Sequence, residues 1–153
     1  MDKIKIVLPK EQDSNIDLIE LRLAERINII RGDSATGKSF MTSQLQDIIT
    51  NSGYDNITGT ESGRLKVCSN EREVDSILNQ NNKIIIIDRY DVYSIEAKEK
   101  IQRDIERLTN TWIIITRKCD FKLNIPVGLS MNSLNILDVK TEDKKKVLYM
   151  RKG

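Results

Sequence analysis

The residues with the clearest chemical pattern lie at positions 32–39, which read Gly-Asp-Ser-Ala-Thr-Gly-Lys-Ser. This run fits the phosphate-binding pattern G-x-x-x-x-G-K-[ST] at every fixed position. In that pattern the backbone N–H groups surround a phosphate, Lys38 reaches the β- and γ-phosphates, and the Ser39 hydroxyl ligates Mg²⁺. The sequence therefore predicts a Mg-nucleotide site. Its predicted binding residues are Gly32, Asp33, Ser34, Ala35, Thr36, Gly37, Lys38, Ser39 and Phe40.

The residues on either side of this motif predict the strand and the helix that such a loop needs. Residues 27–30 form a short apolar run, rich in β-branched side chains, that ends at the loop. Apolar residues then recur at helical spacing, and Gly53 follows them as a stop signal. These apolar residues are Phe40, Met41, Leu45, Ile48 and Ile49. The motif therefore falls at the strand-to-helix junction in which a phosphate-binding loop works.

A candidate metal-binding acid follows a run of four isoleucines at residues 84–87. Such a run is apolar on both faces, which is typical of a strand in the middle of a parallel sheet covered by helices. Asp88 comes directly after it, at the carboxyl end of the predicted strand. This is the pattern of a Walker B aspartate, which positions Mg²⁺. Ser39 and Asp88 are therefore the predicted metal-binding residues.

The rest of the chain alternates predicted strands and helices before a different tail. Helices are expected after the capping residues Asn70 and Ser94. The polar stretch at residues 51–64 contains three glycines and is interpreted as a mobile loop. Further strands are expected at residues 3–8, 19–23, 65–68, 112–116, 134–140 and 147–150. This order predicts an α/β fold with right-handed crossovers between parallel strands, and a C-terminal β-hairpin.

The composition is that of an ordinary globular protein and excludes several kinds of chemistry. The chain has 153 residues, of which 39% are hydrophobic and 31% are charged, so a single domain over residues 1–153 is expected. It has no histidine, which excludes His-based acid–base catalysis, zinc sites that contain His, and Ser-His triads. Cys68 and Cys119 lack metal-site spacing and are expected to be reduced thiols. No signal peptide or membrane span is apparent, so a cytoplasmic location without membrane contact is expected.

Because of residues 32–39 and Asp88, the chain resembles the P-loop NTPase superfamily over residues 26–117. It is similar to the branch that includes AAA and ABC ATPases, because a strand at 65–68 separates the two motifs and two strands precede the loop. The resemblance implies a three-layer P-loop NTPase fold with a mostly parallel sheet, N-terminal antiparallel strands and a C-terminal β-hairpin. It also implies ATP and Mg²⁺ as cofactors, with Asp88 holding the ion through a water opposite Ser39.

The same resemblance implies an ATPase and assigns catalytic roles. Lys38 contacts the phosphates, and Thr116 occupies the place of a γ-phosphate-sensing residue, with Arg117 beside it. A strand-end hydroxyl that bonds only to the backbone is the plain alternative for Thr116. The Asn-Lys-x-Asp motif of Ras-type GTPases is absent from the sequence, which favours ATP over GTP.

The chain departs from this branch at Arg89, where hydrolytic members place a glutamate that orients the attacking water. Asp91 lies two residues further on and is the candidate substitute. The ABC signature sequence is absent, and an arginine finger is indicated by charge alone. The candidates for it are Arg64, Arg72, Arg103 and Arg107. ATP hydrolysis is therefore expected to be slow, or to depend on a second copy of the chain or on a protein partner that completes the site.

Arg89 also supports a different enzyme class. Asp88-Arg89-Tyr90 followed by Ser94 resembles the motif of thymidylate-kinase-like enzymes, in which the arginine binds the phosphate of the acceptor nucleotide. The short chain, the lack of an arginine-rich lid and the terminal hairpin argue against that family. An ion pair with Asp91 or with a helix carboxylate is the structural alternative for Arg89.

Further alternatives concern switching and partners. A non-enzymatic module would use the γ-phosphate to order the loop at residues 51–64. The lysine run at residues 144–146 is expected to be a solvated turn, with contact to an anionic partner as the alternative. Nucleic acid is not indicated, because aromatic residues make up only 5% of the chain and do not interleave with basic ones. A nucleotide is therefore the expected small-molecule partner.

Overall fold

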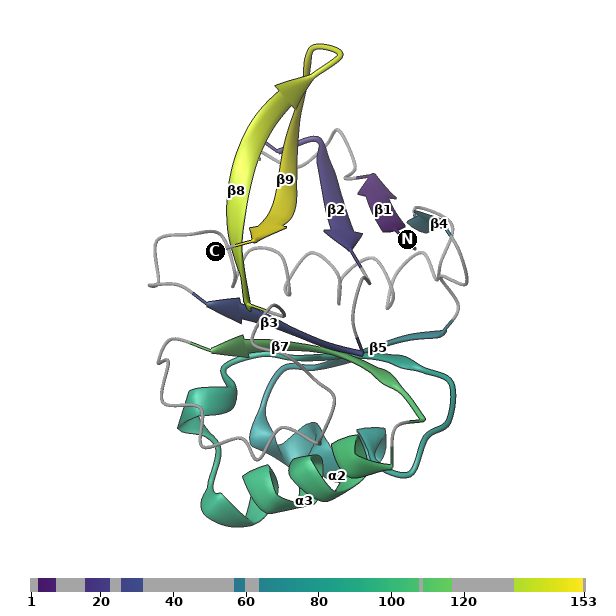
Figure 1. Ribbon diagram of the computed structural model, residues 1–153, viewed down its shortest axis with the longest axis vertical. Helices are drawn as coiled ribbons and strands as arrows, with labels where there is room; N and C mark the ends of the chain where they lie inside the picture. The colour runs from purple at the N-terminus through teal and green to yellow at the C-terminus, as the bar shows by residue number, and fades with distance from the viewer. Residues whose placement is uncertain are drawn as a thin grey trace.

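The computed structural model describes residues 3–7, 16–22, 26–31, 57–59, 64–107, 109–116 and 134–152. The strands among them form one nine-stranded sheet in the order β4-β1-β2-β9-β8-β3-β7-β6-β5 (Figure 1). The strands are β1 Lys3–Val7, β2 Leu18–Arg22, β3 Ile27–Arg31, β4 Ile57–Gly59, β5 Leu65–Cys68, β6 Ile84–Ile87, β7 Thr111–Thr116, β8 Leu134–Glu142 and β9 Lys145–Lys152. The helical segments are η2 Glu71–Glu73, α2 Val74–Ile77, η3 Tyr90–Val92 and α3 Ile95–Glu106. The fold class is therefore α/β, as predicted.

The strands from β3 to β5 form the parallel part of the sheet. β7 pairs with β3 on one side and with β6 on the other, and β5 pairs with β6. Parallel neighbours need crossover connections, and α2 and α3 supply them between β5, β6 and β7. Both helices lie on the same face of these strands (Figure 1). The predicted parallel pairing of these strands is confirmed.

The other part of the sheet is mostly antiparallel. β1 pairs with β2 and with β4, and β8 pairs with β9, each in antiparallel orientation. β9 runs parallel to β2, and β8 runs parallel to β3, so the hairpin joins the two parts. The N-terminal antiparallel strands and the C-terminal hairpin are thus confirmed, but the whole sheet is mixed and curled (Figure 1). The helix predicted after the phosphate-binding motif lies outside the described residues, so a second helical layer stays a prediction.

The structure corrects the predicted loop at residues 51–64. Within it, β4 pairs with β1 through Ile57, Thr58 and Gly59. A three-residue strand carries no periodic signal of its own, and it forms here because β1 offers an unpaired backbone edge. The prediction of an uninterrupted loop was therefore wrong at these three residues.

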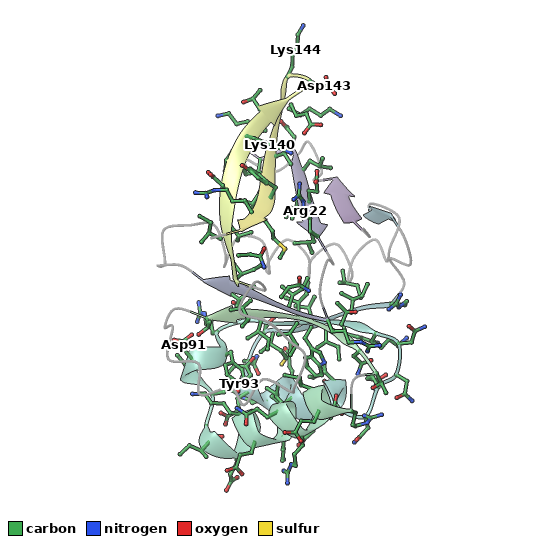
Figure 2. The ribbon with its side chains drawn as sticks, viewed as in Figure 1. Arg22, Asp91, Tyr93, Lys140, Asp143 and Lys144 are labelled. Carbon is green, nitrogen blue, oxygen red and sulfur yellow. The ribbon has the colours of Figure 1, made fainter. Side chains whose placement is uncertain are left out.

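The structure also lengthens the predicted hairpin. Residues 141–142 and 145–146 were predicted to lie in the connecting turn, but Thr141 pairs with Lys146 and Glu142 with Lys145. The strands continue through polar residues because cross-strand hydrogen bonds need no apolar pattern. A turn of only Asp143 and Lys144 remains, at the end of the hairpin (Figure 2). The lysine run is exposed, as expected for a solvated segment.

The core lies on both faces of the parallel strands. Side chains alternate between the faces of a strand, so β6 sends Ile85 and Ile87 toward α3 and sends Ile84 and Ile86 to the opposite face. All four are at most 1% exposed. Full burial of such a side chain contributes about 1.5–3 kcal/mol. The prediction that this strand is buried on both faces is confirmed.

The predicted capping residues begin the helical segments. The Asn70 side chain accepts from the backbone N–H of Arg72 at 3.0 Å, and Ser94 Oγ accepts from that of Ala97 at 3.2 Å. Glu73 turns back and accepts from the backbone N–H of Ser69 at 3.0 Å. In the part of the chain that the structure describes, none of the helices is long and apolar enough to cross a membrane.

Candidate nucleotide-binding site

The candidate site lies where the parallel strands end. We call this end the carboxyl edge: Cys68 on β5, Ile87 on β6, Thr116 on β7 and Arg31 on β3. Thr116 is the register partner of Arg31, and Ile87 is that of Cys68. Ligands of open α/β sheets bind outside this kind of edge. The sheet thus brings together the end of β7, the residue after β6 and the point at which the phosphate-binding motif begins.

The residues predicted to bind phosphate follow β3 directly in the sequence but lie outside the described residues. They are Gly32, Asp33, Ser34, Ala35, Thr36, Gly37, Lys38, Ser39 and Phe40. Arg117 and Cys119 lie outside the described ranges too. The contacts of the loop with a nucleotide therefore stay predictions. The structure gives the place where the chain leaves β3, which is beside the end of β7.

Asp88 continues the backbone ladder of the sheet one residue beyond β6. Its N–H donates to the carbonyl oxygen of Cys68 at 2.9 Å, and the residue is only 6% exposed. A carboxylate loses hydration when it is buried, and this is costly unless a cation or hydrogen-bond donors compensate the charge. An acidic oxygen ligand in this place has the chemistry that Mg²⁺ prefers.

Thr116 is the second buried polar residue at the carboxyl edge, with 2% of its surface exposed. It ends β7, the strand that separates β3 from β6. Its position is therefore between the start of the phosphate-binding motif and Asp88. A hydroxyl both donates and accepts hydrogen bonds, so it suits contact with a phosphate oxygen or with a water beside it.

Arg89 turns the chain away from the sheet. Its backbone is left-handed, with φ 54° and ψ 42°, and its side chain is exposed. This conformation costs a residue with a side chain about 1–2 kcal/mol. Among the described residues its guanidinium makes no ion pair, with Asp91 or with a helix carboxylate. The alternative of a structural ion pair is therefore not supported there.

Asp91 lies on the short turn η3 between two buried tyrosines. Tyr90 and Tyr93 are 6% and 5% exposed and pack in the cluster under the sheet. Asp91 itself is half-buried, and its carbonyl oxygen accepts from Lys98 Nζ at 3.2 Å. Figure 2 shows Asp91 at the end of the parallel strands and Tyr93 below them. The tyrosines thus anchor the segment that carries Asp91.

Contacts that the sequence did not predict join the segments after β5 and β6. The backbone N–H of Ser94 donates to a carboxylate oxygen of Glu71. Cys68 Sγ lies 3.5 Å from Tyr93 Oη and donates to the carbonyl oxygen of Asn70 at 3.3 Å. The spacing of the two tyrosines in the 90–93 segment was the available signal, because residues three apart share one face of a helical turn. The contacts of Glu71 with α3 had no comparable signal.

Burial controls the protonation of two of these groups. It raises the pKa of the Cys68 thiol, and the nearby charges of Glu73 and Asp88 act in the same direction. Burial also raises the pKa of Tyr93, with further contributions from Cys68 and the same carboxylates. Both groups are therefore neutral at physiological pH. The protonated thiol is a poor nucleophile. Cys68 is a free thiol in the structure, as predicted.

No family model and no curated protein matches the chain. The function must therefore be argued from the chemistry of the site itself.

The predicted site needs only a few protein ligands to hold Mg²⁺. Among the described residues, no group of three or more Cys, Asp or Glu is arranged to hold a metal ion. Mg²⁺ commonly keeps several waters and takes one or two carboxylates together with substrate phosphates. Ser39 and the buried Asp88 match that donor set. The chemistry of these two residues is compatible with Mg²⁺.

The candidate arginine fingers divide between the two edges of the sheet. Arg72 lies on η2, directly after the end of β5, and is exposed at the carboxyl edge. Arg64 precedes β5 and donates to the carbonyl oxygen of Asn82, which lies before β6. Arg103 and Arg107 lie near the end of α3, which runs from the carboxyl edge toward the opposite edge. Of these four arginines, only Arg72 is near the chain's own site.

Proposed function

We propose that the chain is an ATP-binding P-loop NTPase of the branch that includes AAA and ABC ATPases. The observation that carries the proposal is the strand order β3-β7-β6. It gives three strand ends in a row: one leads into the phosphate-binding motif, the next ends in Thr116, and the third leads into Asp88. The motif pattern and the strand order are independent observations, and they favour the same ligand.

In this proposal different residues of the chain bind the phosphates, position Mg²⁺ and orient the attacking water. Lys38 neutralises the β- and γ-phosphates, while Ser39 and Asp88 position Mg²⁺, which supplies charge stabilisation of the phosphates when it is bound. Thr116 donates its hydroxyl hydrogen toward the γ-phosphate. Asp91 orients the attacking water. The absence of the guanine motif of Ras-type GTPases favours ATP.

We propose slow hydrolysis by the isolated chain, because Arg89 stands where related hydrolases carry a glutamate. An arginine supplied in trans accelerates other phosphate-loop enzymes by about 10³–10⁵. A second copy or a protein partner would supply the missing group. A module that binds ATP but does not hydrolyse it would use the same site, with no turnover.

A second candidate function is phosphoryl transfer to a nucleoside monophosphate. The observation that favours it is the exposed side chain of Arg89, which makes no ion pair among the described residues and directly follows Asp88. A planar guanidinium binds phosphate oxygens in pairs. ADP formation that rises sharply with one monophosphate would select this candidate. No rise with any common nucleoside monophosphate would exclude it.

Thermal unfolding with and without MgATP tests the shared site. At a ligand concentration of about 100 Kd, binding to the folded state adds about 2.7 kcal/mol to the unfolding free energy. We expect Lys38→Ala to abolish the increase in Tm, and Asp88→Asn to abolish the part that requires Mg²⁺. Lys66→Ala is the matched control, because Lys66 is an exposed lysine on β5. The same Tm increase in Lys38→Ala as in wild type would overturn the proposal.

A further inference from the structure

The β8–β9 hairpin extends beyond the strands that flank it (Figure 1). β8 pairs with β3 only through Leu134 and Asn135, whereas its pairing with β9 continues to Glu142. Among the described strands, none pairs with the other edge of β8 over residues 137–141, which we call the free edge. An unpaired strand edge is a template for pairing with another chain. The free edge is therefore a candidate interaction surface, and it is independent of the proposed nucleotide function.

The two-residue turn of the hairpin determines which backbone groups lie along the free edge. In a hairpin with a two-residue loop, the residues that flank the loop exchange backbone hydrogen bonds, and here these are Glu142 and Lys145. Hydrogen-bonded and non-hydrogen-bonded pairs then alternate along the ladder. Leu137, Val139 and Thr141 therefore direct their N–H and C=O groups away from β9. The structure agrees, because the N–H of Val139 donates to the side chain of the preceding residue at 2.8 Å.

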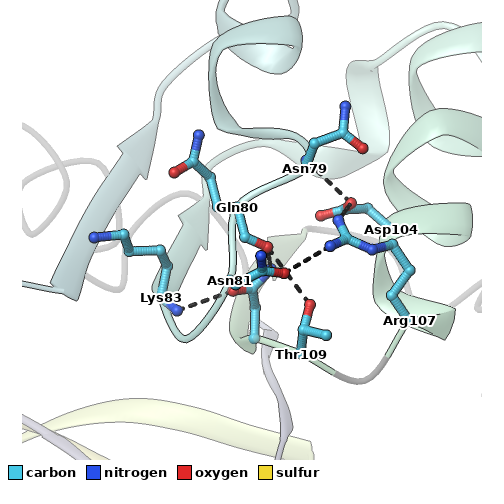
Figure 3. Close-up of polar contacts among 8 residues, drawn as sticks. Asn79, Gln80, Asn81, Lys83, Asp104, Arg107 and Thr109 are labelled. Atoms are coloured by element: carbon cyan, nitrogen blue, oxygen red, sulfur yellow. Dashed lines mark hydrogen bonds and ion pairs between the residues drawn. The ribbon is translucent and has the colours of Figure 1, made fainter.

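The Val139 N–H differs in its partner from another backbone group that lies outside the ladders. The backbone N–H of Asn79, after α2, donates to Asp104 of α3 and so joins two segments of the fold (Figure 3). The Val139 N–H instead donates to the neighbouring carboxylate of Asp138. Such local side-chain bonds compete with sheet ladders, so pairing with another strand would replace this one. The Val139 side chain is 48% exposed, which leaves the edge accessible.

The free edge is complementary to itself in the antiparallel orientation. Val139 is its middle residue, so a two-fold axis through Val139 pairs the whole free edge with that of a second copy. Asp138 then lies opposite the partner's Lys140, and Lys140 lies opposite the partner's Asp138. Opposite charges directly across a ladder stabilise the pairing. An unrelated strand would need the same order of charges, which a second copy has by symmetry.

We infer that the free edge pairs with the free edge of a second copy and forms a symmetric antiparallel dimer about Val139. The outward N–H and C=O groups of Val139 then bond to those of the partner's Val139. Asp138 and Lys140 now pair with Arg151 at 2.9 Å and with Glu142 at 3.2 Å. Ion pairs as exposed as these contribute little, so they do not oppose the new contacts. The interface is short, and the dimer is therefore expected to be weak.

Sedimentation velocity and backbone amide NMR of the full chain, without nucleotide, test this dimer between about 10 µM and 1 mM. We expect the dimer fraction to rise with concentration, and the amide signals of Val139 and Thr141 to shift in proportion to it. The amide signal of Asn79, far from the hairpin, should stay constant. A chain that is monomeric at about 1 mM, or a dimer that leaves the Val139 and Thr141 signals unchanged, would overturn the inference.

Charge reversal at Lys140 tests the complementarity of the edge. Lys140→Glu places carboxylates opposite each other on both sides of the axis, and we expect dimerisation to weaken about tenfold or more. The double variant D138K/K140E restores opposite charges across the axis and should recover dimerisation. Lys66→Glu is the matched control, because it makes the same charge change at an exposed lysine on β5, at the far end of the sheet. A double variant that dimerises no better than Lys140→Glu would overturn the inference.

Val139→Pro tests the backbone contact separately from the charges. Proline is tolerated in an edge strand where the N–H faces away from the ladder, so the hairpin should still form. The variant cannot donate across the two-fold axis, and we expect it to remain monomeric at about 1 mM. The amide signals of β9 report whether the hairpin is intact. Wild-type dimerisation in a folded Val139→Pro variant would overturn the inference.

Discussion

Thr116 is the register partner of Arg31 in the parallel ladder between β7 and β3. The residue after Arg31 begins the phosphate-binding motif, and the strand on the other side of β7 ends immediately before Asp88. Thr116 thus lies at a strand end between the two halves of the candidate site. With 2% of its surface exposed, Thr116 itself is shielded from bulk water.

Replacing Thr116 tests whether this hydroxyl acts on the γ-phosphate. Thr116→Val keeps the shape of the side chain and removes the hydroxyl. We expect the Tm increase with MgATP to persist but ATP turnover to fall by about 10²-fold, the order of loss for one donor to the transition state. Phosphate release under single-turnover conditions measures this.

Thr116→Ser, which keeps the hydroxyl, is the matched control and should retain most of the turnover. Thr116→Val should also lower the unfolding free energy by about 1–3 kcal/mol, because the group that the hydroxyl contacts loses its partner. If Thr116→Val is destabilised and yet turns over ATP at the wild-type rate, the hydroxyl has only a structural role.

Local patterns in the sequence predicted several of the helices and strands, because residues that are neighbours in the chain determine where such elements form. The structure confirms three such predictions: the strand formed by the isoleucine run of β6, the cap at Ser94 and the cap at Asn70. Each depends only on residues close by in the chain. Strand β4 was missed because its partner strand β1 lies far along the chain. The last pairs of the hairpin were missed because their polar residues carry no apolar alternation. Local patterns do not predict which distant segments contact each other in the fold.

The polar residues of the candidate site and of α3 also differ in whether local sequence patterns could predict them. The positions of Asp88 and Thr116 at strand ends were predictable, since a buried apolar run followed by a polar residue marks a strand end. The contact of Glu71 with Ser94 and the burial of Asp104 were not, because each requires knowing which helix packs against which segment. Asp104 in particular follows Arg103 on a predicted amphipathic helix and has no sequence feature of a buried acid.

Arg89 is expected to be unfavourable for folding. Its left-handed backbone suits Asn better than Arg. Arg89→Asn should therefore leave the unfolding free energy unchanged or raise it by up to about 1 kcal/mol, as measured by urea unfolding. The same variant should lower nucleotide-dependent phosphoryl transfer if the guanidinium binds a phosphate.

The control for Arg89 is Arg151→Asn on the hairpin, which breaks the 2.9 Å ion pair with Asp138 and should have no effect on nucleotide chemistry. A large loss of stability in Arg89→Asn would show that the arginine side chain makes a structural contact, and it would remove the argument for a phosphate-binding role.

Alkaline pH is expected to destabilise the protein through Cys68 and Tyr93. Both groups have a raised pKa in the folded state, so their neutral forms are favoured by folding. In the unfolded chain the thiol ionises near its ordinary value of 9.0 and the phenol near 10.0. The stabilisation is therefore complete below pH 9 and is lost as the pH rises above these values.

Urea unfolding at pH 7.5 and at pH 10.5 measures this loss. At pH 7.5, Tyr93→Phe should cost about 1 kcal/mol through the lost contact with the Cys68 thiol. At pH 10.5 the difference from wild type should shrink, because the variant has no phenol to ionise. Cys68→Ala should likewise reduce the slope of stability against pH. Parallel pH profiles for wild type and both variants would contradict the assignment.

The hairpin turn should be improvable, because Asp143 and Lys144 have φ values of 51° and 64°. Two consecutive left-handed residues in a two-residue hairpin loop define a type I′ turn, for which Asn-Gly is the preferred sequence. The double substitution D143N/K144G should relieve backbone strain and raise Tm by about 2–4 °C, corresponding to about 1 kcal/mol for a domain of this size.

Lys146→Gly is the control: this exposed residue lies in β9 and pairs with Thr141, so glycine there should cost about 0.5–1 kcal/mol. A lower Tm for the double variant would mean that contacts of the Asp143 and Lys144 side chains outweigh the backbone strain, and would favour an interaction role for the hairpin tip.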